Sequence, residues 1–553
     1  MSMTLSADCD NSTDLAFIRY WSNRHGYRFT TTGEGDIHIH VVRSNARRFT
    51  YIEELCRASD EIYEMALEGA PAKAVLKIMC SSIRGLRYAL NLFRKKPRQS
   101  VWNNDVAYEY PHFPLRGIVE GFYGKPWTFA QRLDMLQFIA DQNMNAYIYA
   151  PKDDAYHREK WRELYNEEAG ADLQALMQSS QALGLHFYYC IAPGLSMQYS
   201  SEEDYAALLL KAKQLYQLGI RRFGLLLDDI PEELQHAEDR LAYPDLAAAH
   251  IRLINRCFHD LRKWDSCIEL IVCPTQYWGK GEEYYITALG QAIHPSIDLF
   301  WTGRNICSQE ITLMEAAVFT RNASRPPLYW DNYPVNDMEM TDELHIGPYR
   351  QRDAKLYCFS RGIIANGMSL PESSKIAFAT IADYAWNPVR YDSEHSWRKA
   401  IGLVVGGTLR EDFLRFADNV RYSCLHPSDA PQLEKALTRF EFEYKHEKTE
   451  ERPLAIKRMK QFALRMAESA QALRASSEQY PALMGELERW LCKYEQGCEL
   501  LLHAIDYLDN DASGGALEQL QSEYAWYRQD SAYVFGDVLA SFMNKLLDQG
   551  FTK

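Results

Sequence analysis

Two adjacent carboxylates, Asp228 and Asp229, directly follow an apolar run at 223–227 and precede Pro231. Such a run is typical of a strand that is buried on both faces of a parallel sheet, whose active sites lie at the carboxyl ends of strands. Successive strand side chains point to opposite faces, so both aspartates can enter one pocket only if the strand stops, as Pro231 favours. The pair could then share acid–base and charge-stabilising work. A helix N-cap or a pair of divalent-metal ligands would look the same, and the pair alone does not decide.

The elements that would position this pair alternate between strand-type and helix-type patterns from Arg116 to Pro388. The predicted strands are 117–121, 146–150, 186–191, 223–227, 268–273, 299–302, 328–330 and 362–365. The predicted helices include 128–142, 204–218, 246–264, 282–293, 313–322 and 374–386. A strand followed by a helix, repeated eight times, predicts an α/β fold of the (β/α)8 TIM-barrel type.

Polar or aromatic residues follow the predicted strands at the same end. Besides the two aspartates, these clusters are 120–123, 152–154, 275–277, Trp301, 331–332 and Asn366. Strands commonly end in polar turns, but clusters in phase on one rim of a barrel indicate a single shared pocket.

Two further units flank the predicted barrel. Residues 1–110 contain predicted strands at 36–42, 63–67 and 74–80 and a helix at 82–93, which indicates a small N-terminal α/β domain. The barrel domain is assigned to 111–391. Residues 392–553 lack strand-type runs and contain long helical segments at 453–476, 481–508 and 516–547, which predict a C-terminal helical bundle. Its aromatics are expected in the core, although the bundle could also form a homodimer. They are Trp490, Tyr494, Tyr524, Trp526, Tyr527 and Tyr533.

Two other features favour a structural reading. His38 and His40 share one face of the predicted strand 36–42 and could in principle bind a metal. No acidic or cysteine partner stands at a ligand spacing, so we expect a packed or solvent-facing pair. The basic run 94–98 is expected to be a solvated helix end, and the charged run 445–452 a bridge between two bundle helices.

Composition limits the function further. The 553 residues include 61 basic and 75 acidic side chains, a formal charge of −14, which disfavours nucleic acid and other polyanions as partners. The 12 cysteines form no C-x-x-C pair, which indicates a reducing compartment. We find no secretion signal and no apolar segment of bilayer-spanning length, and therefore expect a cytoplasmic protein without membrane contact. No motif suggests a metal site or another cofactor.

Six strings in the barrel region closely resemble glycoside hydrolase family 84, which contains the β-N-acetylglucosaminidases, including protein O-GlcNAcases. They are RGIVEGFYGKPW (116–127), YAPKDD (149–154), LLLDDI (225–230), CPTQYWG (273–279), WTG (301–303) and WDNYPVND (330–337). They occur in the expected order and spacing. The flanking α/β and helical units also fit the family's arrangement.

The resemblance implies retaining hydrolysis in which the substrate's own 2-acetamido oxygen attacks the anomeric carbon and forms an oxazoline. Asp228 would orient the acetamido N–H and balance the oxazolinium charge, while Asp229 would protonate the leaving oxygen and later activate water. Tyr277 and Asn332 would hold the acetamido group. The sugar would be bound by Lys152, the Gly121 backbone, Asp337, Asn366 and Trp330 as an apolar wall.

Three expectations depend on details of these residues. An ionised Asp228 should raise the pKa of Asp229 by like-charge repulsion and so help to keep the acid protonated. Asn366 is followed by Gly367 where family members often carry proline, so the loop should be more mobile. The residues after the barrel are predicted to be helical throughout, so we expect no acetyltransferase-like domain.

The residues leave some alternatives open. A hexosaminidase acting on free oligosaccharides or cell-wall fragments would carry the same strings as one acting on glycoproteins. Cleavage of hyaluronan is disfavoured because a polyanion would approach an acidic protein. A non-catalytic glycan-binding module is disfavoured by the presence of both aspartates and Tyr277.

Overall fold

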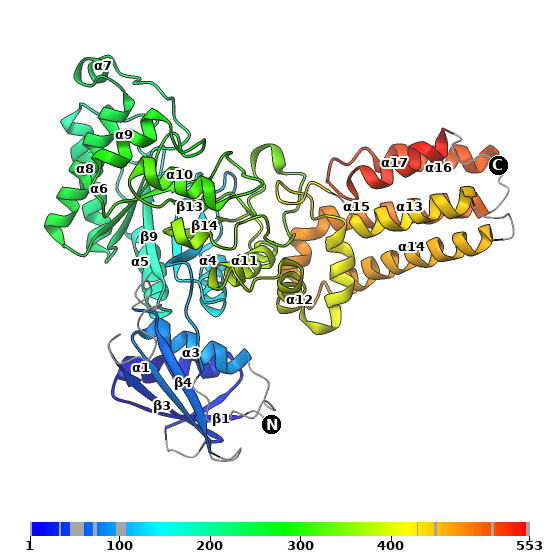
Figure 1. Ribbon diagram of the computed structural model, residues 1–553, viewed down its shortest axis with the longest axis horizontal. Helices are drawn as coiled ribbons and strands as arrows, with labels where there is room; N and C mark the ends of the chain where they lie inside the picture. Colours follow the sequence, from blue (N-terminus) through cyan, green and yellow to red (C-terminus); the bar gives the residue numbers. More distant parts are fainter. Residues whose placement is uncertain are drawn as a thin grey trace.

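The computed structural model describes residues 3–31, 35–44, 60–69, 74–95, 107–428, 430–446, 451–509 and 514–548. Part of the basic run at 94–98 and part of the charged run at 445–452 lie outside these ranges. In Figure 1 a closed barrel is flanked by a small N-terminal unit, in blue, and by a long helical bundle in yellow to red. The predicted fold class, a TIM barrel between an α/β unit and a helical unit, is confirmed.

The barrel consists of eight parallel strands that overlap the eight predicted ones. They are β7 (Leu115–Glu120), β8 (Ala146–Tyr149), β9 (His186–Ile191), β10 (Arg222–Leu226), β11 (Glu269–Cys273), β12 (Asp298–Trp301), β13 (Leu328–Asp331) and β14 (Gly362–Asn366). β14 pairs with β7 and closes the ring. Because every strand runs in the same direction, the carboxyl ends of all eight meet on one rim.

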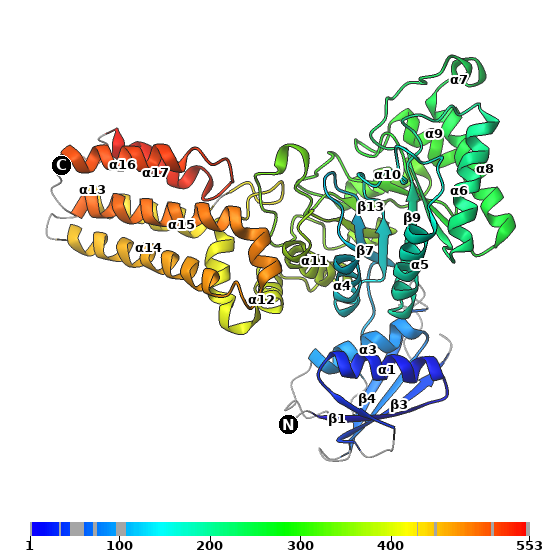
Figure 2. The ribbon, with the colours of Figure 1, turned by 180° about the vertical axis from the view of Figure 1, so that it is seen from behind.

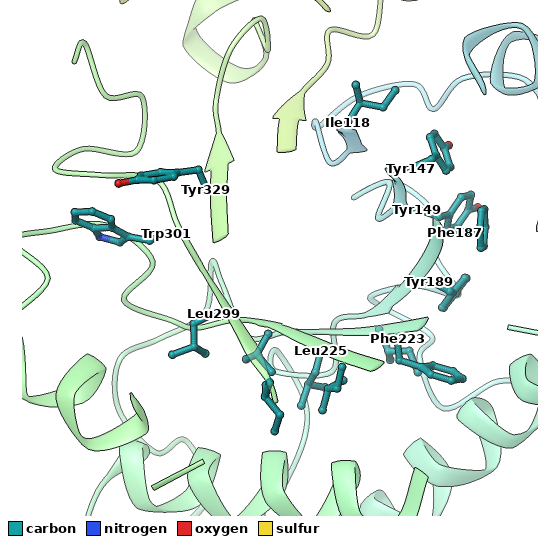
Figure 3. Packing of buried hydrophobic residues seen from close by; sticks show 14 of the residues in the cluster. Ile118, Tyr147, Tyr149, Phe187, Tyr189, Phe223, Leu225, Leu299, Trp301 and Tyr329 are labelled. Atoms are coloured by element: carbon teal, nitrogen blue, oxygen red, sulfur yellow. The ribbon is translucent and has the colours of Figure 1, made fainter. Parts of the chain in front are cut away.

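Both faces of the barrel strands are buried, which explains their continuous apolar runs. Residues such as Phe187, Leu225 and Leu299 lie on the outer side of the strands and pack against the surrounding helices (Figure 3). The alternate residues, including Ile148, Leu226 and Ile271, form a second cluster with the other barrel strands. The interior is therefore filled by side chains below the rim.

The helices around the barrel are α4 (Phe129–Asp141), α5 (Glu167–Ala182), α6 (Glu202–Gln217), α7 (Ala237–Ala242), α8 (Leu246–Trp264), α9 (Tyr284–Ala292), α10 (Leu313–Ala323) and α11 (Pro371–Trp386). Local sequence sets several of their starts. Thr128 and Gln131 form a capping box at α4, and Thr312 and Glu315 form another at α10. α5 was not among the predicted helices.

The expected alternation is wrong at the β13–β14 connection, which the structure describes in full. Its residues form two 3-10 turns, η2 (Met338–Met340) and η3 (Leu356–Phe359), and no α-helix. A buried ion pair holds this irregular segment to the barrel: Arg352 donates to both carboxylate oxygens of Asp331, at 2.9 and 2.8 Å. Both side chains are at most 2% exposed.

Replacing Arg352 by methionine should strongly destabilise the barrel. The change leaves the Asp331 carboxylate buried without its cation, a loss worth about 3–5 kcal/mol in free energy of unfolding. Arg361→Met is the matched control, because its partner Asp298 is 3.0 Å away but the Arg361 side chain is 47% exposed. That loss should stay below about 1 kcal/mol. Urea unfolding followed by tryptophan fluorescence measures both, and equal losses would contradict the prediction.

The N-terminal unit is a six-stranded mixed sheet with two helices. Its elements are β1 (Thr4–Cys9), α1 (Ser12–Arg24), β2 (Arg28–Thr30), β3 (Ile37–Arg43), β4 (Tyr63–Glu68), β5 (Ala74–Cys80), α3 (Ile83–Lys95) and β6 (Ala107–Tyr108), in the sheet order β2-β1-β3-β5-β4-β6. Both helices lie on the side of the sheet that faces the barrel (Figure 1; Figure 2). Arg87 of α3 is buried there and donates to the carbonyl oxygens of Met144 and Leu183.

His38 and His40 are partly exposed, in line with a packed or solvent-facing pair, and both lie near an acidic residue that stands at no ligand spacing in the sequence. Asp8 Oδ1 lies 2.8 Å from His40 Nδ1 and 3.3 Å from His38 Nε2. The partner comes from β1, an element that was not predicted, whose parallel pairing with β3 sets Asp8 opposite His40. Among the described residues, no group of three or more His, Cys, Asp or Glu side chains could hold a metal ion.

The C-terminal bundle contains α12 (Ser393–Asp418), α13 (Pro431–His446), α14 (Arg452–Ala475), α15 (Pro481–Asp509), α16 (Gly514–Tyr527) and α17 (Gly536–Leu547). The predicted helix 516–547 is two helices, because the chain turns at Phe535, whose φ is +61°. Four of the six aromatic residues considered above are buried in the bundle core, while Trp526 is 56% exposed. No helix in the described part of the chain is long and apolar enough to cross a membrane.

Candidate active site

One cavity of about 470 Å³ opens among the carboxyl-terminal strand ends and brings all nine predicted site residues together. They are Gly121, Lys152, Asp228, Asp229, Tyr277, Trp330, Asn332, Asp337 and Asn366. Residues outside that prediction also line it, notably Tyr123, Ile306 and Met338. The shared location is a finding, while the role of each residue stays a prediction.

The two aspartates reach the same cavity because the strand before them ends. β10 stops at Leu226, and Asp229 adopts a left-handed backbone conformation with φ +51°. This conformation is rare for a residue with a side chain, and it breaks the alternation that would send neighbouring carboxylates to opposite faces. Asp228 is 8% exposed, whereas the Asp229 side chain is 30% exposed. Asp228 thus lies deeper in the cavity than Asp229.

Lys152, which follows β8, places a cation between the two carboxylates. Its Nζ donates to Asp228 Oδ2 and lies 3.5 Å from Asp229 Oδ2. Burial alone would lower the pKa of Lys152, but attraction to Asp228 and Asp229 outweighs burial and raises the pKa above its usual value. Lys152 therefore stays charged.

Two tyrosine hydroxyls hold Asp229. Tyr277 donates to Oδ1 at 2.9 Å and Tyr123 donates to Oδ2 at 2.7 Å. Arg158 in turn donates to the Tyr123 hydroxyl at 2.7 Å and to the Asp229 carbonyl oxygen at 3.2 Å. Both tyrosine pKa values are raised, chiefly by burial, so the hydroxyls remain protonated donors.

The expectation of a raised Asp229 pKa is wrong. Burial raises this pKa, but the charge of Lys152 and the hydrogen bonds from Tyr123 and Tyr277 lower it more. The pKa of Asp229 therefore lies below its ordinary value. Repulsion between the two carboxylates does not decide the shift, because the Lys152 cation lies beside both.

Removing the Tyr123 hydroxyl should shift the pH dependence of the reaction. In Tyr123→Phe, ionised Asp229 loses one donor, so its pKa rises and the acid form persists to higher pH. If Asp229 is the general acid, as predicted, the descending limb of kcat/KM, which reports the acid of the free enzyme, should move to higher pH. Profiles with a poor leaving group test this. Tyr284→Phe is the control, since Tyr284 is 70% exposed and bonds to Asp245. A shift to lower pH, or equal shifts in both variants, would contradict the prediction.

Asp228 has one oxygen left for a ligand. Oδ2 accepts from Lys152, while Oδ1 is buried and has no hydrogen-bond partner among the described residues. Buried carboxylate oxygens are normally paired, and an unpaired one at a cavity is suited to a donor supplied by a bound molecule. The cavity therefore offers an acceptor beside a fixed cation.

The opposite wall is fixed by a chain of hydrogen bonds. Asn332 Oδ1 accepts from Trp330 Nε1 at 2.8 Å and from Asn366 Nδ2 at 3.1 Å. Asn366 Oδ1 accepts from the Gly121 N–H at 3.1 Å. These bonds assign the amide orientations and leave the indole face as an apolar surface.

Packing accounts for the glycine after Asn366. Gly367 is buried, and a Cβ atom added there would lie 2.9 Å from the Trp127 ring and 3.1 Å from the Phe378 ring. Asn366 itself is 4% exposed. Close approach of two aromatic rings explains the absence of a side chain, and the greater mobility of the loop stays a prediction.

Asp337 and the residue after it form the outer edge of the cavity. Asp337 Oδ2 accepts from the Tyr123 N–H at 2.7 Å, and burial raises the pKa of this carboxyl. Met338 has φ +54° and is 68% exposed, and Ile306 is 47% exposed. An apolar rim therefore adjoins the polar interior.

Comparisons with known proteins agree with this geometry. A family model described as beta-N-acetylglucosaminidase matches residues 116–418. The Protein O-GlcNAcases of Rattus norvegicus and Mus musculus are each 32% identical over 276 residues, which cover 49% of this chain and 30% of the relative. The match thus spans less than a third of these relatives' length.

Two solved structures extend the likeness beyond the barrel. A mutant of Thermobaculum terrenum O-GlcNAc hydrolase is 34% identical with a TM-score of 0.74, over 79% of this chain and 95% of that one. A protein named CpGH84B is 25% identical with a TM-score of 0.82, over 99% of this chain and 96% of that one. The N-terminal unit and the bundle therefore belong to the shared architecture.

Proposed function

The chain belongs to the β-N-acetylglucosaminidase family, glycoside hydrolase family 84, and from this premise we propose that it removes terminal β-linked GlcNAc from Ser and Thr of glycoproteins. The reaction retains the anomeric configuration and passes through an oxazoline formed by the substrate. The observation that carries the proposal is the unpaired, buried Asp228 Oδ1 beside the Lys152–Asp228–Asp229 cluster.

Asp228 has the geometry to act on the acetamido group. Its free oxygen accepts the acetamido N–H, and this hydrogen bond aims the carbonyl oxygen at the anomeric carbon. As the oxazoline ring forms, the nitrogen becomes positive, and the fixed carboxylate stabilises that charge. Tyr277 and Asn332 hold the other side of the group, and Trp330 provides the apolar wall beneath the sugar.

Asp229 has the geometry to move the proton. As the bond from the anomeric carbon to the leaving oxygen breaks, Asp229 gives its proton to that oxygen. In the second step it takes a proton from water, which attacks the anomeric carbon and opens the oxazoline. Lys152, the Gly121 backbone, Asp337 and Asn366 bind the sugar hydroxyls.

Binding of substrate also accounts for how Asp229 becomes an acid. In the structure the Tyr277 hydroxyl donates to Asp229. When that hydroxyl turns to the acetamido oxygen, the carboxylate loses a donor, and expulsion of water disfavours its ionised form. Both changes raise the pKa of Asp229 when its proton is needed.

A panel of four substrates tests the assignment: an aryl β-GlcNAc, an aryl β-GalNAc, chitobiose and a peptide carrying β-GlcNAc on Ser or Thr. We expect the peptide to be cleaved with a kcat/KM comparable to or above that of chitobiose. Slow peptide cleavage with fast chitobiose cleavage would instead assign an oligosaccharide hexosaminidase. Binding of GlcNAc without turnover of any substrate would assign a glycan-binding module.

Self-association through the bundle is a further part of the proposal. Most of the aromatics that suggested it are buried in the bundle core, so it now depends on the exposed Trp526. We expect a dimer at micromolar concentration that Trp526→Glu weakens. Analytical ultracentrifugation measures the mass, and a monomer for the unsubstituted chain would contradict this expectation. The division of the chain at 110/111 and 391/392 is also a proposal. The separate apolar cluster of the N-terminal unit supports the first boundary, whereas the bundle's cluster continues into the barrel region at Leu344 and Ile376.

A further inference from the structure

A second large cavity lies outside the barrel, in the C-terminal bundle. It has a volume of about 640 Å³ and forms a groove between α13 and α14, which lie side by side (Figure 1). We call it the α13–α14 groove. It extends along α13 from Pro431 to Glu443 and thus over about 18 Å, at 1.5 Å per helical residue. It is remote in sequence from the active-site residues.

The groove combines an apolar floor with cationic sides. Phe440, Met459 and the half-buried Phe462 line its floor. The sides carry Lys435 and Arg439 from α13 and Arg458 and Arg465 from α14. Helical spacing of three and four residues puts the exposed Phe442 in line with Lys435 and Arg439, and the exposed Leu454 in line with Arg458 and Arg465. Apolar and basic surface therefore continues onto both rims.

The charges in the groove are not balanced. Glu443 is the one carboxylate in its lining, and it accepts from Arg439 Nε at 2.7 Å and from Arg458 Nη2 at 2.5 Å. This bridge fixes α13 to α14. Lys435 and Arg465 have no ion pair within the described ranges, which leave out the loop at 447–450. Four cations face one carboxylate in a chain whose formal charge is −14. The local field thus favours a negatively charged occupant.

We propose that the α13–α14 groove binds an acidic amphipathic helix of a partner protein. A helix of about 12 residues matches its length, buries an apolar stripe on the floor and sets acidic side chains against both cationic sides. Such a helix would add one more antiparallel or parallel neighbour to the bundle. The proposal does not depend on the reaction at the barrel, and it names a surface by which acidic glycoproteins could be retained.

A designed peptide tests the groove directly. The probe is a fluorescein-labelled 14-residue helix with leucines at positions i, i+3, i+4 and i+7 and glutamates on both flanks. Fluorescence anisotropy with the full chain should show saturable binding that weakens with salt. Lys435→Glu combined with Arg465→Glu should raise Kd at least tenfold. The control combines Lys457→Glu with Arg398→Glu, two exposed residues of α14 and α12 outside the groove, for the same change in net charge.

Each outcome bears on the proposal. Both double variants should hydrolyse an aryl β-GlcNAc at the unsubstituted rate, which shows that the barrel is folded. No binding, or equal Kd values for the groove and control variants, would overturn the proposal. Equal binding of a scrambled peptide or of duplex DNA would mean that the groove binds polyanions non-specifically. That result would also overturn the proposal. A concentration-dependent dimer that the peptide dissociates would assign the groove to a second copy of this chain instead.

Discussion

A substrate whose acetamido group is replaced by a hydroxyl is expected to be hydrolysed at least about 10⁵-fold more slowly than the GlcNAc compound. The acetamido oxygen is the proposed nucleophile, and well-oriented intramolecular nucleophiles have effective molarities of 10⁵–10⁸ M. Among the described residues that line the cavity, none is placed to replace it. Asp228 is held by Lys152, and Asp229 is held by two tyrosine hydroxyls.

The measurement compares kcat/KM for an aryl β-glucoside and the matching aryl β-GlcNAc. An aryl 2-deoxy-β-glucoside controls for loss of the hydrogen bond to Asp228, because it lacks any group at that carbon. Mass spectrometry of quenched reactions should find no sugar attached to the protein. A trapped sugar ester on either aspartate would refute the substrate-assisted mechanism.

Asp229→Asn is expected to slow the hydrolysis of poor leaving groups by about 10²- to 10⁴-fold, the usual contribution of general-acid catalysis. A serine alkoxide needs a proton to depart, whereas a nitrophenolate does not. The rate of oxazoline formation from nitrophenyl β-GlcNAc should therefore fall much less in Asp229→Asn.

Asp228→Asn is the matched comparison, since it is the same change at the adjacent residue. It removes orientation of the acetamido group and stabilisation of the oxazolinium charge, which every substrate needs. The loss of kcat/KM in Asp228→Asn should be large for all leaving groups. We would measure kcat/KM for both variants over aryl glycosides of graded phenol pKa. A steep dependence for Asp228→Asn with a flat one for Asp229→Asn would mean that the roles are reversed.

The sequence predicted the barrel well because its strands depend on local pattern, whereas most of the site residues were assigned through the resemblance to the family. Each strand is a short apolar run followed by polar residues, and closure of eight parallel strands brings those residues to one rim. The Asp228–Asp229 pair could be placed at the end of a strand because the apolar run ends at Leu227 and Pro231 follows two residues after Asp229. The lack of an α-helix between β13 and β14 departs from the repeat, and the buried pair that fixes this segment, Asp331 with Arg352, joins residues 21 positions apart in the sequence.

The pKa shifts in the site could not be predicted from residues that are neighbours in the sequence. The sign of the Asp229 pKa shift is set by Lys152 and Tyr123, which are 77 and 106 residues away in the chain. Tyr123 stood in a rim cluster and in a family string, which was a usable signal. Arg158 stood in neither, and its contact with Tyr123 depends on the course of the loop after β8. Likewise, the contact of Asp8 with His40 depends on the pairing of β1 with β3.

The pocket also limits how this protein could be redesigned. A Cβ atom at Gly121 would lie 2.4 Å from Cζ2 of Trp330, so the ring occupies the space that any other residue at position 121 requires. In a library of variants, substitutions at 121 should survive only together with a smaller residue at 330. A smaller residue at 330 should not require a change at 121, because glycine at 121 fits beside a smaller side chain. Attempts to enlarge this pocket should therefore start at position 330 and then use the space that opens at 121.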